Sequence, residues 1–253
     1  MSVKKYWLRF TDKFGATIIH PQFIMKRYEL KAIQDNKQYI KGDLIDLGCG
    51  TIPYKEIINP MVKSYTALDK PNAYNYSSEK PDVYADILSI PLKDNRFDTV
   101  LILQVLEHLS QPQKALVESN RILKKGGHLI ISVPFMYPLH DLPQDYYRYT
   151  EFMIRELLKD SKYRVVKLIP QGNFPEFWLF SLIMFFLMRM RDLLQKRKSF
   201  FNLVIFFILA VISIPLIFIV NILIVLFEIL KIKPGRFLNY YPINYVVVAK
   251  NIK

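Results

Sequence analysis

Short apolar runs bounded by Gly, Pro or Asp recur along the first 170 residues and once more near the end of the chain. They lie at residues 44–47, 64–68, 83–85, 97–103, 128–133, 163–169 and 245–249. Runs of this length without strict alternation are typical of parallel strands that are buried on both faces. Segments of helical periodicity separate most of them. The pattern therefore predicts an α/β fold with a seven-stranded, mostly parallel sheet and helices on both faces.

Three segments carry the helical signal. Residues 5–41 place apolar side chains at spacings of seven, three and seven, and we interpret residues 1–41 as a helical cover. A second helix is predicted over residues 115–125, ended by Gly126-Gly127. A third is expected to begin at Thr150, which is a favourable N-cap residue.

The segment between the sixth and seventh strands is far more apolar than a soluble helix requires. Phe174 to Met188 is almost wholly apolar, and Leu203 to Leu230 is interrupted only by Ser213, Pro215, Asn221 and Glu228. About 20 apolar residues suffice to span a bilayer. We therefore expect an apolar helical membrane insertion. The predicted divisions of the chain are a helical cover at 1–41, a core at 42–170, the insertion at 171–241 and a final core strand at 242–253.

Composition supports an anionic partner surface. The 253 residues carry a formal net charge of +13, which suits nucleic acid or an acidic membrane face. The basic surplus flanks the apolar insertion and shows no basic–aromatic stacking pattern, so nucleic acid is disfavoured. Residues 1–19 lack the apolar core of a signal peptide, and the single cysteine excludes an internal disulfide. The four histidines show no ligand spacing, so no metal site is predicted; they are His20, His108, His128 and His140.

Candidate chemistry begins at the turn after the first strand. Gly48 and Gly50 permit a sharp turn and close approach of a ligand, at the strand end where α/β sheets bind ligands. Pro53 replaces the third glycine of a dinucleotide fingerprint, which argues against a pyrophosphate site. Asp46 instead suits a cationic portion of a ligand. Further polar residues follow the second, third and fourth strands, namely Asp69, Asp86 and Gln104.

Three ordered segments resemble the motifs of class I S-adenosylmethionine-dependent methyltransferases, in particular the type 11-like small-molecule family. They are DLGCGT from Asp46, FDTVL from Phe97 with LEHL from Leu106, and ESNRILKKGGHLIISVP from Glu118. The resemblance implies a Rossmann-like fold and S-adenosyl-L-methionine as cofactor. It further implies cofactor contacts at Asp46, Gly48, Cys49, Gly50, Asp69, Asp86, Ile87, Gln104 and His108. For His108 a role in helix packing is an open alternative, and Cys49 is also interpreted as a small space-filling residue.

The loop after the fifth strand has the sequence PLHDLPQDYYRYT from Pro138. It resembles the corresponding loop of methyltransferases among bacterial surface-glycan and lipid-modification enzymes. A hydroxyl acceptor needs a base, and His140 is the candidate because its usual pKa lies near neutrality. Asp141 or Asp145 would orient His140 or replace it. Arg148, with Tyr147, would bind an anionic substrate group; the alternative for Arg148 is a packed connection to the following helix.

Taken together, these features lead us to expect a membrane-associated methyltransferase that O-methylates a lipid-linked or surface-glycan acceptor, with its catalytic domain on the cytoplasmic side of the cell membrane. Methylation of a quinone or other membrane lipid is the alternative within the same chemistry. A cofactor-binding membrane protein without catalysis is the alternative outside it. The oligomeric state is left open.

The insertion admits two arrangements, because the last strand must rejoin the sheet. With two full spans, the basic loop at 189–198 would lie on the side of the membrane opposite the catalytic domain. The positive-inside tendency would keep that loop in the cytoplasm, but the catalytic domain must also be cytoplasmic to reach its cofactor. In the other arrangement the first segment lies in the interface and the second is a re-entrant hairpin bent near Ser213–Pro215, since Pro215 removes a backbone hydrogen bond. We favour the second arrangement.

Overall fold

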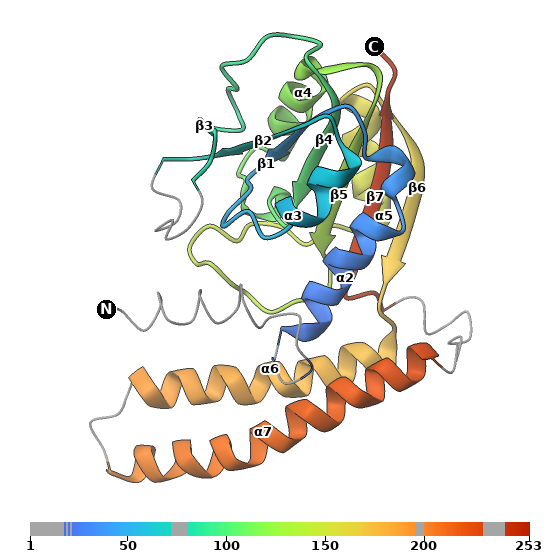
Figure 1. Ribbon diagram of the computed structural model, residues 1–253. Coiled ribbons are helices and arrows are strands. Elements are labelled where there is room, and N and C mark those ends of the chain that lie inside the picture. Colours follow the sequence, from blue (N-terminus) through green and yellow to red (C-terminus); the bar gives the residue numbers. More distant parts are fainter. Residues whose placement is uncertain (1–17, 19, 21, 72–79, 196–199, 230–240) are drawn as a thin grey trace. The chain divides into compact units, whose positions relative to one another are not determined.

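Seven strands build the sheet of the computed structural model, which describes residues 18, 20, 22–71, 80–195, 200–229 and 241–253 (Figure 1). The strands are β1 (Asp43–Leu47), β2 (Ser64–Asp69), β3 (Val83–Tyr84), β4 (Phe97–Leu103), β5 (Leu123–Pro134), β6 (Tyr163–Gln171) and β7 (Asn244–Asn251). Their order is β3-β2-β1-β4-β5-β7-β6. Only β7 is antiparallel to its neighbours β5 and β6. The predicted Rossmann-like, mostly parallel sheet is confirmed.

Helices cover both faces of this sheet, as expected. The helical elements of this part of the chain are α2 (Phe23–Gln34), η1 (Lys37–Tyr39), α3 (Lys55–Ile58), η2 (Asn59–Met61), η3 (Leu106–His108), α4 (Pro112–Ile122) and α5 (Glu151–Asp160). Successive residues of a strand point to opposite faces. Leu44 of β1 therefore packs with Ile33 of α2, whereas Ile45 packs with Leu116 of α4.

The predicted cover helix over residues 5–41 is only partly within the described chain, because residues 1–17 lie outside it. In the part that is described, the helix α2 ends at Gln34 rather than at Gly42. Asn36 donates its side-chain amide to the carbonyl of Ala32 at 2.8 Å, and the short helix η1 follows. Gly42 instead serves the start of β1: its φ is +65°, and an added Cβ would collide with the Asp98 carboxylate.

The helix predicted over residues 115–125 is displaced toward its N-terminus. It runs from Pro112 to Ile122, and Leu123 already begins β5. The physical reason lies at the far end of the chain. The buried Asn251 side chain donates to the carbonyls of Asn120, Leu123 and Lys124, at 3.1 to 3.3 Å. These contacts satisfy the carbonyls that a helix leaves open at its C-terminus, so the helix ends before the two glycines.

Contacts divide the chain into two units. One holds residues 28–171 and 243–253, and therefore the whole sheet. The other holds α6 (Phe174–Gln195) and α7 (Phe200–Ile229) together with the described residues before Tyr28. Within this second unit α6 and α7 pack along each other (Figure 1).

The helix α7 is long and apolar enough to cross a membrane over Val204–Phe227, where the mean hydropathy is 3.0 and 28% of the segment is buried. Large apolar side chains along it are exposed, for example Phe207 at 58%, Val211 at 70% and Ile214 at 70%. This is the one such helix in the described part of the chain, so α6 does not qualify by the same criterion.

The predicted bend at Ser213–Pro215 is wrong, because α7 continues as one helix through Pro215. A proline inside a helix removes one backbone hydrogen bond. A turn there would instead leave about four C=O groups open at the new C-terminus and about four N–H groups open at the new N-terminus, which an apolar environment cannot satisfy. The Ser213 hydroxyl also remains tied to the helix, donating to the carbonyl of Ala210 at 3.2 Å.

Candidate functional site

The glycine turn after β1 is held against the end of β2. The amides of Gly48 and Cys49 donate to the carbonyl of Leu68 at 2.8 and 3.1 Å. The amide of Gly50 donates to Asp69 Oδ2 at 2.8 Å. Gly48 has a φ of +76°, and a Cβ there would lie 2.6 Å from Cγ2 of Val105. The turn therefore requires glycine for both conformation and space, and it lies beside the chain that follows β4.

Two buried carboxylates flank this turn. Asp46 is 4% exposed and accepts a hydrogen bond from the hydroxyl of Tyr65 at 2.5 Å. Burial raises the pKa of Asp46 to about 6, the Tyr65 hydrogen bond opposes that rise, and the nearby Asp69 adds to it. Asp69 is 7% exposed and also accepts from the amide of Lys70 at 2.7 Å. The negative potential of this pair favours a cationic ligand.

Cys49 is buried, and this burial together with the negative charge of Asp46 and Asp69 raises the pKa of its thiol. A neutral, buried thiol is neither a nucleophile nor a metal ligand. Its position agrees with the interpretation of Cys49 as a space-filling residue of the turn.

The predicted adenine-side residues lie at the neighbouring strand end. Asp86 is tied to the loop after β3, with Oδ1 accepting from the amide of Leu88 at 2.9 Å. Its Oδ2 forms a half-exposed ion pair with Lys70 Nζ at 3.2 Å. Ile87 is 4% exposed and packs in the core below. The structure thus places Asp46, Asp69 and Asp86 in order along one edge of the sheet.

Gln104 does not present its amide nitrogen to that edge. The nitrogen donates to Ser132 Oγ at 2.7 Å and to Asn244 Oδ1 at 3.0 Å. These bonds connect the ends of β4, β5 and β7. The side chain therefore supports the sheet, and the backbone of Gln104, with a φ of +56°, redirects the chain into η3.

Glu107 and His108 follow on η3, and Glu107 was absent from the predicted site. Its side chain is completely buried, and within the described chain neither carboxylate oxygen accepts a hydrogen bond. Burial raises the pKa of Glu107 to about 8. The ring of His108 is held on one side, where Nδ1 lies 2.7 Å from the carbonyl oxygen of Gln144. The sequence signal for Glu107 was an acidic residue next to His108 in an otherwise apolar run.

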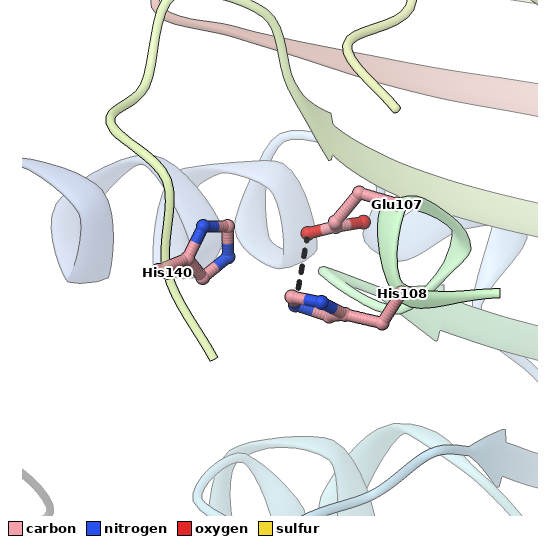
Figure 2. Close-up of side chains that lie close together, drawn as sticks. All are labelled: Glu107, His108 and His140. Atoms are coloured by element: carbon pink, nitrogen blue, oxygen red, sulfur yellow. Dashed lines mark ion pairs between the residues drawn. The ribbon is translucent and has the colours of Figure 1, made fainter. Parts of the chain in front are cut away.

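The loop after β5 brings His140 to the same place (Figure 2). The His140 ring lies 4.7 Å from the His108 ring, edge to face, and 5.0 Å from that of Tyr137. Ligand atoms of Glu107, His108 and His140 lie within 4.8 Å of one another. Burial and the neighbouring His108 lower the pKa of His140. The prediction of no metal site rested on sequence spacing alone, whereas the fold brings His140 to Glu107 and His108 in three dimensions.

Asp145 and Arg148 build the loop rather than face a substrate. The two Asp145 oxygens lie 2.6 and 2.7 Å from Nη1 and Nη2 of Arg148, and Oδ2 also accepts from the amide of His140 at 2.9 Å. Arg148 further donates to the carbonyls of Tyr137 and Pro138 at 3.1 and 3.0 Å. Hydrogen bonds from Arg148 hold the pKa of Asp145 well below its usual range. The packed alternative for Arg148 fits this geometry better than an anion-binding role.

The two remaining predicted residues of the loop lie apart from the cluster. Asp141 is exposed and has a φ of +49°. Tyr147 is 39% exposed, stacks on Tyr149 at 5.5 Å and donates its hydroxyl to the carbonyl of Ser110 at 3.2 Å. Of the predicted catalytic residues, the structure brings only His140 to His108 and Glu107.

Comparison with known proteins identifies the domain that these elements form. Residues 45–131 match the model of a methyltransferase domain family. This part of the chain is therefore a methyltransferase domain. The fold of the methyltransferase domain is shared with a crystal structure of an S-adenosylmethionine-dependent methyltransferase from Archaeoglobus fulgidus, at a TM-score of 0.57, 19% identity and coverage of 97% of this chain and 100% of that one.

Two relatives align with parts of the chain. An uncharacterized protein of Methanocaldococcus jannaschii is 34% identical over 104 residues, covering 41% of this chain and 44% of that protein. The demethylmenaquinone methyltransferase of Renibacterium salmoninarum is 34% identical over 84 residues, covering 31% of this chain and 33% of the relative. The matched segments thus span less than half the length of either relative.

The cofactor of the methyltransferase domain is S-adenosylmethionine, and the residues at the sheet edge fit it. The turn leaves no room for a side chain at Gly48 and admits close approach of a ligand. Asp46 offers negative charge to the amino acid portion of a cationic cofactor. Asp69 accepts hydrogen bonds from the amides of Gly50 and Lys70, and a carboxylate at this strand end suits ribose hydroxyls.

Proposed function

We propose that the whole chain is an enzyme that transfers a methyl group to a hydroxyl of a lipid-linked or surface-glycan acceptor at a membrane. The observation that carries this proposal is the group formed by Glu107 and His108, which follow β4, and His140, which follows β5. Among the described residues, no hydrogen-bond donor reaches the Glu107 carboxylate. Val105, which touches the Gly48 turn, immediately precedes η3. The cofactor turn and the polar group are therefore neighbours along the same sheet edge.

When bound, S-adenosylmethionine supplies an electrophilic methyl group on a sulfonium centre. The task of the chain is to hold an acceptor hydroxyl in line at short distance and to dispose of its proton. His140 is suited to accept this proton, because its lowered pKa keeps the imidazole neutral at neutral pH. Asp145 fixes the loop that carries His140, and we assign it a positioning role in place of a base.

The exposed apolar surface of α7 supports the membrane part of the proposal. A helix of this hydropathy that exposes Phe207, Val211 and Ile214 has a large area to remove from water. Acceptors built on a lipid reside in the same environment. Location at the cytoplasmic membrane face, where the cofactor is available, follows as part of the proposal.

Methylation of a quinone is the second candidate. It is favoured by the similarity to demethylmenaquinone methyltransferase over 84 residues. A quinone precursor is also a membrane lipid, so the apolar helix is compatible with both acceptors. The two candidates differ in the methylated atom, carbon in a ring or oxygen of a hydroxyl.

The test is methyl transfer by the full chain in detergent, using cofactor labelled on its methyl group and a total membrane lipid extract of the cell that produces the protein. Label in glycolipid or lipid-linked glycan supports the first candidate, and label in the quinone fraction supports the second. Cofactor binding without label in any fraction would contradict both and favour a non-catalytic membrane protein.

A further inference from the structure

The group Glu107, His108 and His140 has the arrangement of a metal site. Both histidine rings are fixed through Nδ1 by oxygen acceptors. His108 Nδ1 lies 2.7 Å from the Gln144 carbonyl oxygen. His140 Nδ1 lies 3.2 Å from the Pro138 carbonyl oxygen and 3.2 Å from Asp145 Oδ2. These three acceptors favour the tautomer with hydrogen on Nδ1, although Nη2 of Arg148 also lies 3.4 Å from Nδ1 of His140. That tautomer leaves Nε2 of each ring with its lone pair.

The lone pairs then converge. His108 Nε2 lies 3.9 Å from Oε1 of Glu107, beyond hydrogen-bond distance (Figure 2). The ring of His140 directs a nitrogen toward the same space (Figure 2). The Glu107 carboxylate is completely buried, and no donor among the described residues reaches it. The facing electron pairs of the three side chains are unfavourable unless a cation lies between them or Glu107, whose pKa is raised to about 8, holds a proton.

We propose that Glu107, His108 and His140 bind a divalent transition-metal ion. Two imidazoles and one carboxylate, with further positions open, form a frequent donor set for zinc and its neighbours. The contacts of Nδ1 with a carbonyl and a carboxylate supply the outer-shell bonds that such histidines usually make. Metal bonds of about 2.0–2.2 Å would place tetrahedral ligand atoms about 3.3–3.6 Å apart. The present separations of up to 4.8 Å require the side chains to close by up to about 1.2–1.5 Å.

The role of this ion rests on the proposed function. An acceptor hydroxyl in an open position loses its proton more readily, because the ion stabilises the alkoxide. His140 then binds the ion through Nε2, and the proton passes to solvent instead of to the imidazole. The new bond joins the alkoxide oxygen to the methyl carbon, while the carbon–sulfur bond breaks and sulfur keeps its electron pair. The residue that the sequence suggested as base thereby acts through the metal.

The alternative is an ion pair between protonated His108 and Glu107, with no metal. The two differ in their response to an added ion. A metal site takes up Zn²⁺, Mn²⁺ or Co²⁺ with one ion per chain and discriminates against Mg²⁺, which prefers all-oxygen ligands. An ion pair binds none of them.

The experiment uses the full chain in detergent, stripped with a chelator and titrated with Co²⁺ and Zn²⁺ in the absence of acceptor. We expect one Co²⁺ per chain with the visible absorption of a four- or five-coordinate ion. Glu107→Gln, His108→Ala and His140→Ala should each weaken binding at least about 100-fold, more than the loss of an outer-shell partner costs. His128→Ala is the matched control, because the His128 ring packs at a tilt against Tyr39 outside the cluster, and this variant should bind as the parent chain does.

Equal binding by the parent chain and Glu107→Gln, or no stoichiometric binding, would overturn the proposal. If a variant fails to fold, X-ray absorption on the zinc-loaded parent chain decides instead: two imidazole nitrogens support the site, and a shell without imidazole refutes it. Because these measurements contain no acceptor, they separate the metal site from the proposed function. Metal binding without methyl transfer would leave the site standing and remove only the role assigned to it.

Discussion

Replacement of Arg148 by alanine should loosen the loop that carries His140. The side chain of Asp145 is 0% exposed and that of Arg148 is 21% exposed, so the pair is largely desolvated. Both Asp145 oxygens and two loop carbonyls depend on the Arg148 guanidinium. Removal of one partner of a buried ion pair costs about 3–5 kcal/mol, because the other charge is left uncompensated. We expect a loss of that size in the free energy of unfolding for Arg148→Ala.

Arg148→Lys should recover less than half of this loss. A lysine ammonium is a point charge and cannot reproduce the parallel bonds from Nη1 and Nη2 to one carboxylate, at 2.6 and 2.7 Å. Arg155→Ala provides the matched control, since Arg155 is exposed on α5. Its free energy of unfolding should stay within about 0.5 kcal/mol of the parent value.

The assay combines urea unfolding of the full chain in detergent with amide hydrogen exchange of residues 137–148. The exchange measurement locates the effect, because the loop should lose protection before the sheet does. If Arg148→Ala unfolds within about 1 kcal/mol of the parent chain and the exchange of residues 137–148 is unchanged, the reasoning about the buried pair is refuted.

Three further outcomes follow from the described geometry. The raised pKa of Asp46, about 6, means that the carboxyl takes up a proton in the fold as the pH falls below 6. Cofactor affinity measured by calorimetry should therefore be about tenfold lower at pH 5 than at pH 7. The ligand-free fold should gain stability as the pH falls over the same range, and Asp46→Asn should abolish both pH dependences. Gly48→Ala and Gly126→Ala both force alanine into a positive φ, at +76° and +77°, but only the former meets a close neighbour, Val105. Urea unfolding should show Gly48→Ala to be the more destabilising by about 1–3 kcal/mol, and equal losses would contradict the steric argument. Asn251→Ala should cost about 1–3 kcal/mol and speed amide exchange at the end of α4, and unchanged exchange there would mean that Asn251 does not terminate the helix.

The sequence by itself determined the sheet and the cofactor edge. Apolar runs made all seven strands visible, including β7 after the long insertion. The edge strands β3 and β6 are partly exposed. The glycines of the first turn and the acids at successive strand ends are local requirements of the same kind. The requirement for glycine at Gly48 is local, because most residues with a side chain do not adopt a positive φ.

Only the tertiary structure decided what the polar residues of the later loop do. Asp145 and Arg148 had the composition of a substrate site, but burial turned them toward each other, since an unpaired charge in that position is costly. Glu107 was invisible as a site residue because its significance depends on His140, which is brought to it from a distant segment by the end of β5. The early end of α4 likewise depends on Asn251, a contact that no local pattern contains. Packing between distant segments is what a periodicity or a motif does not encode.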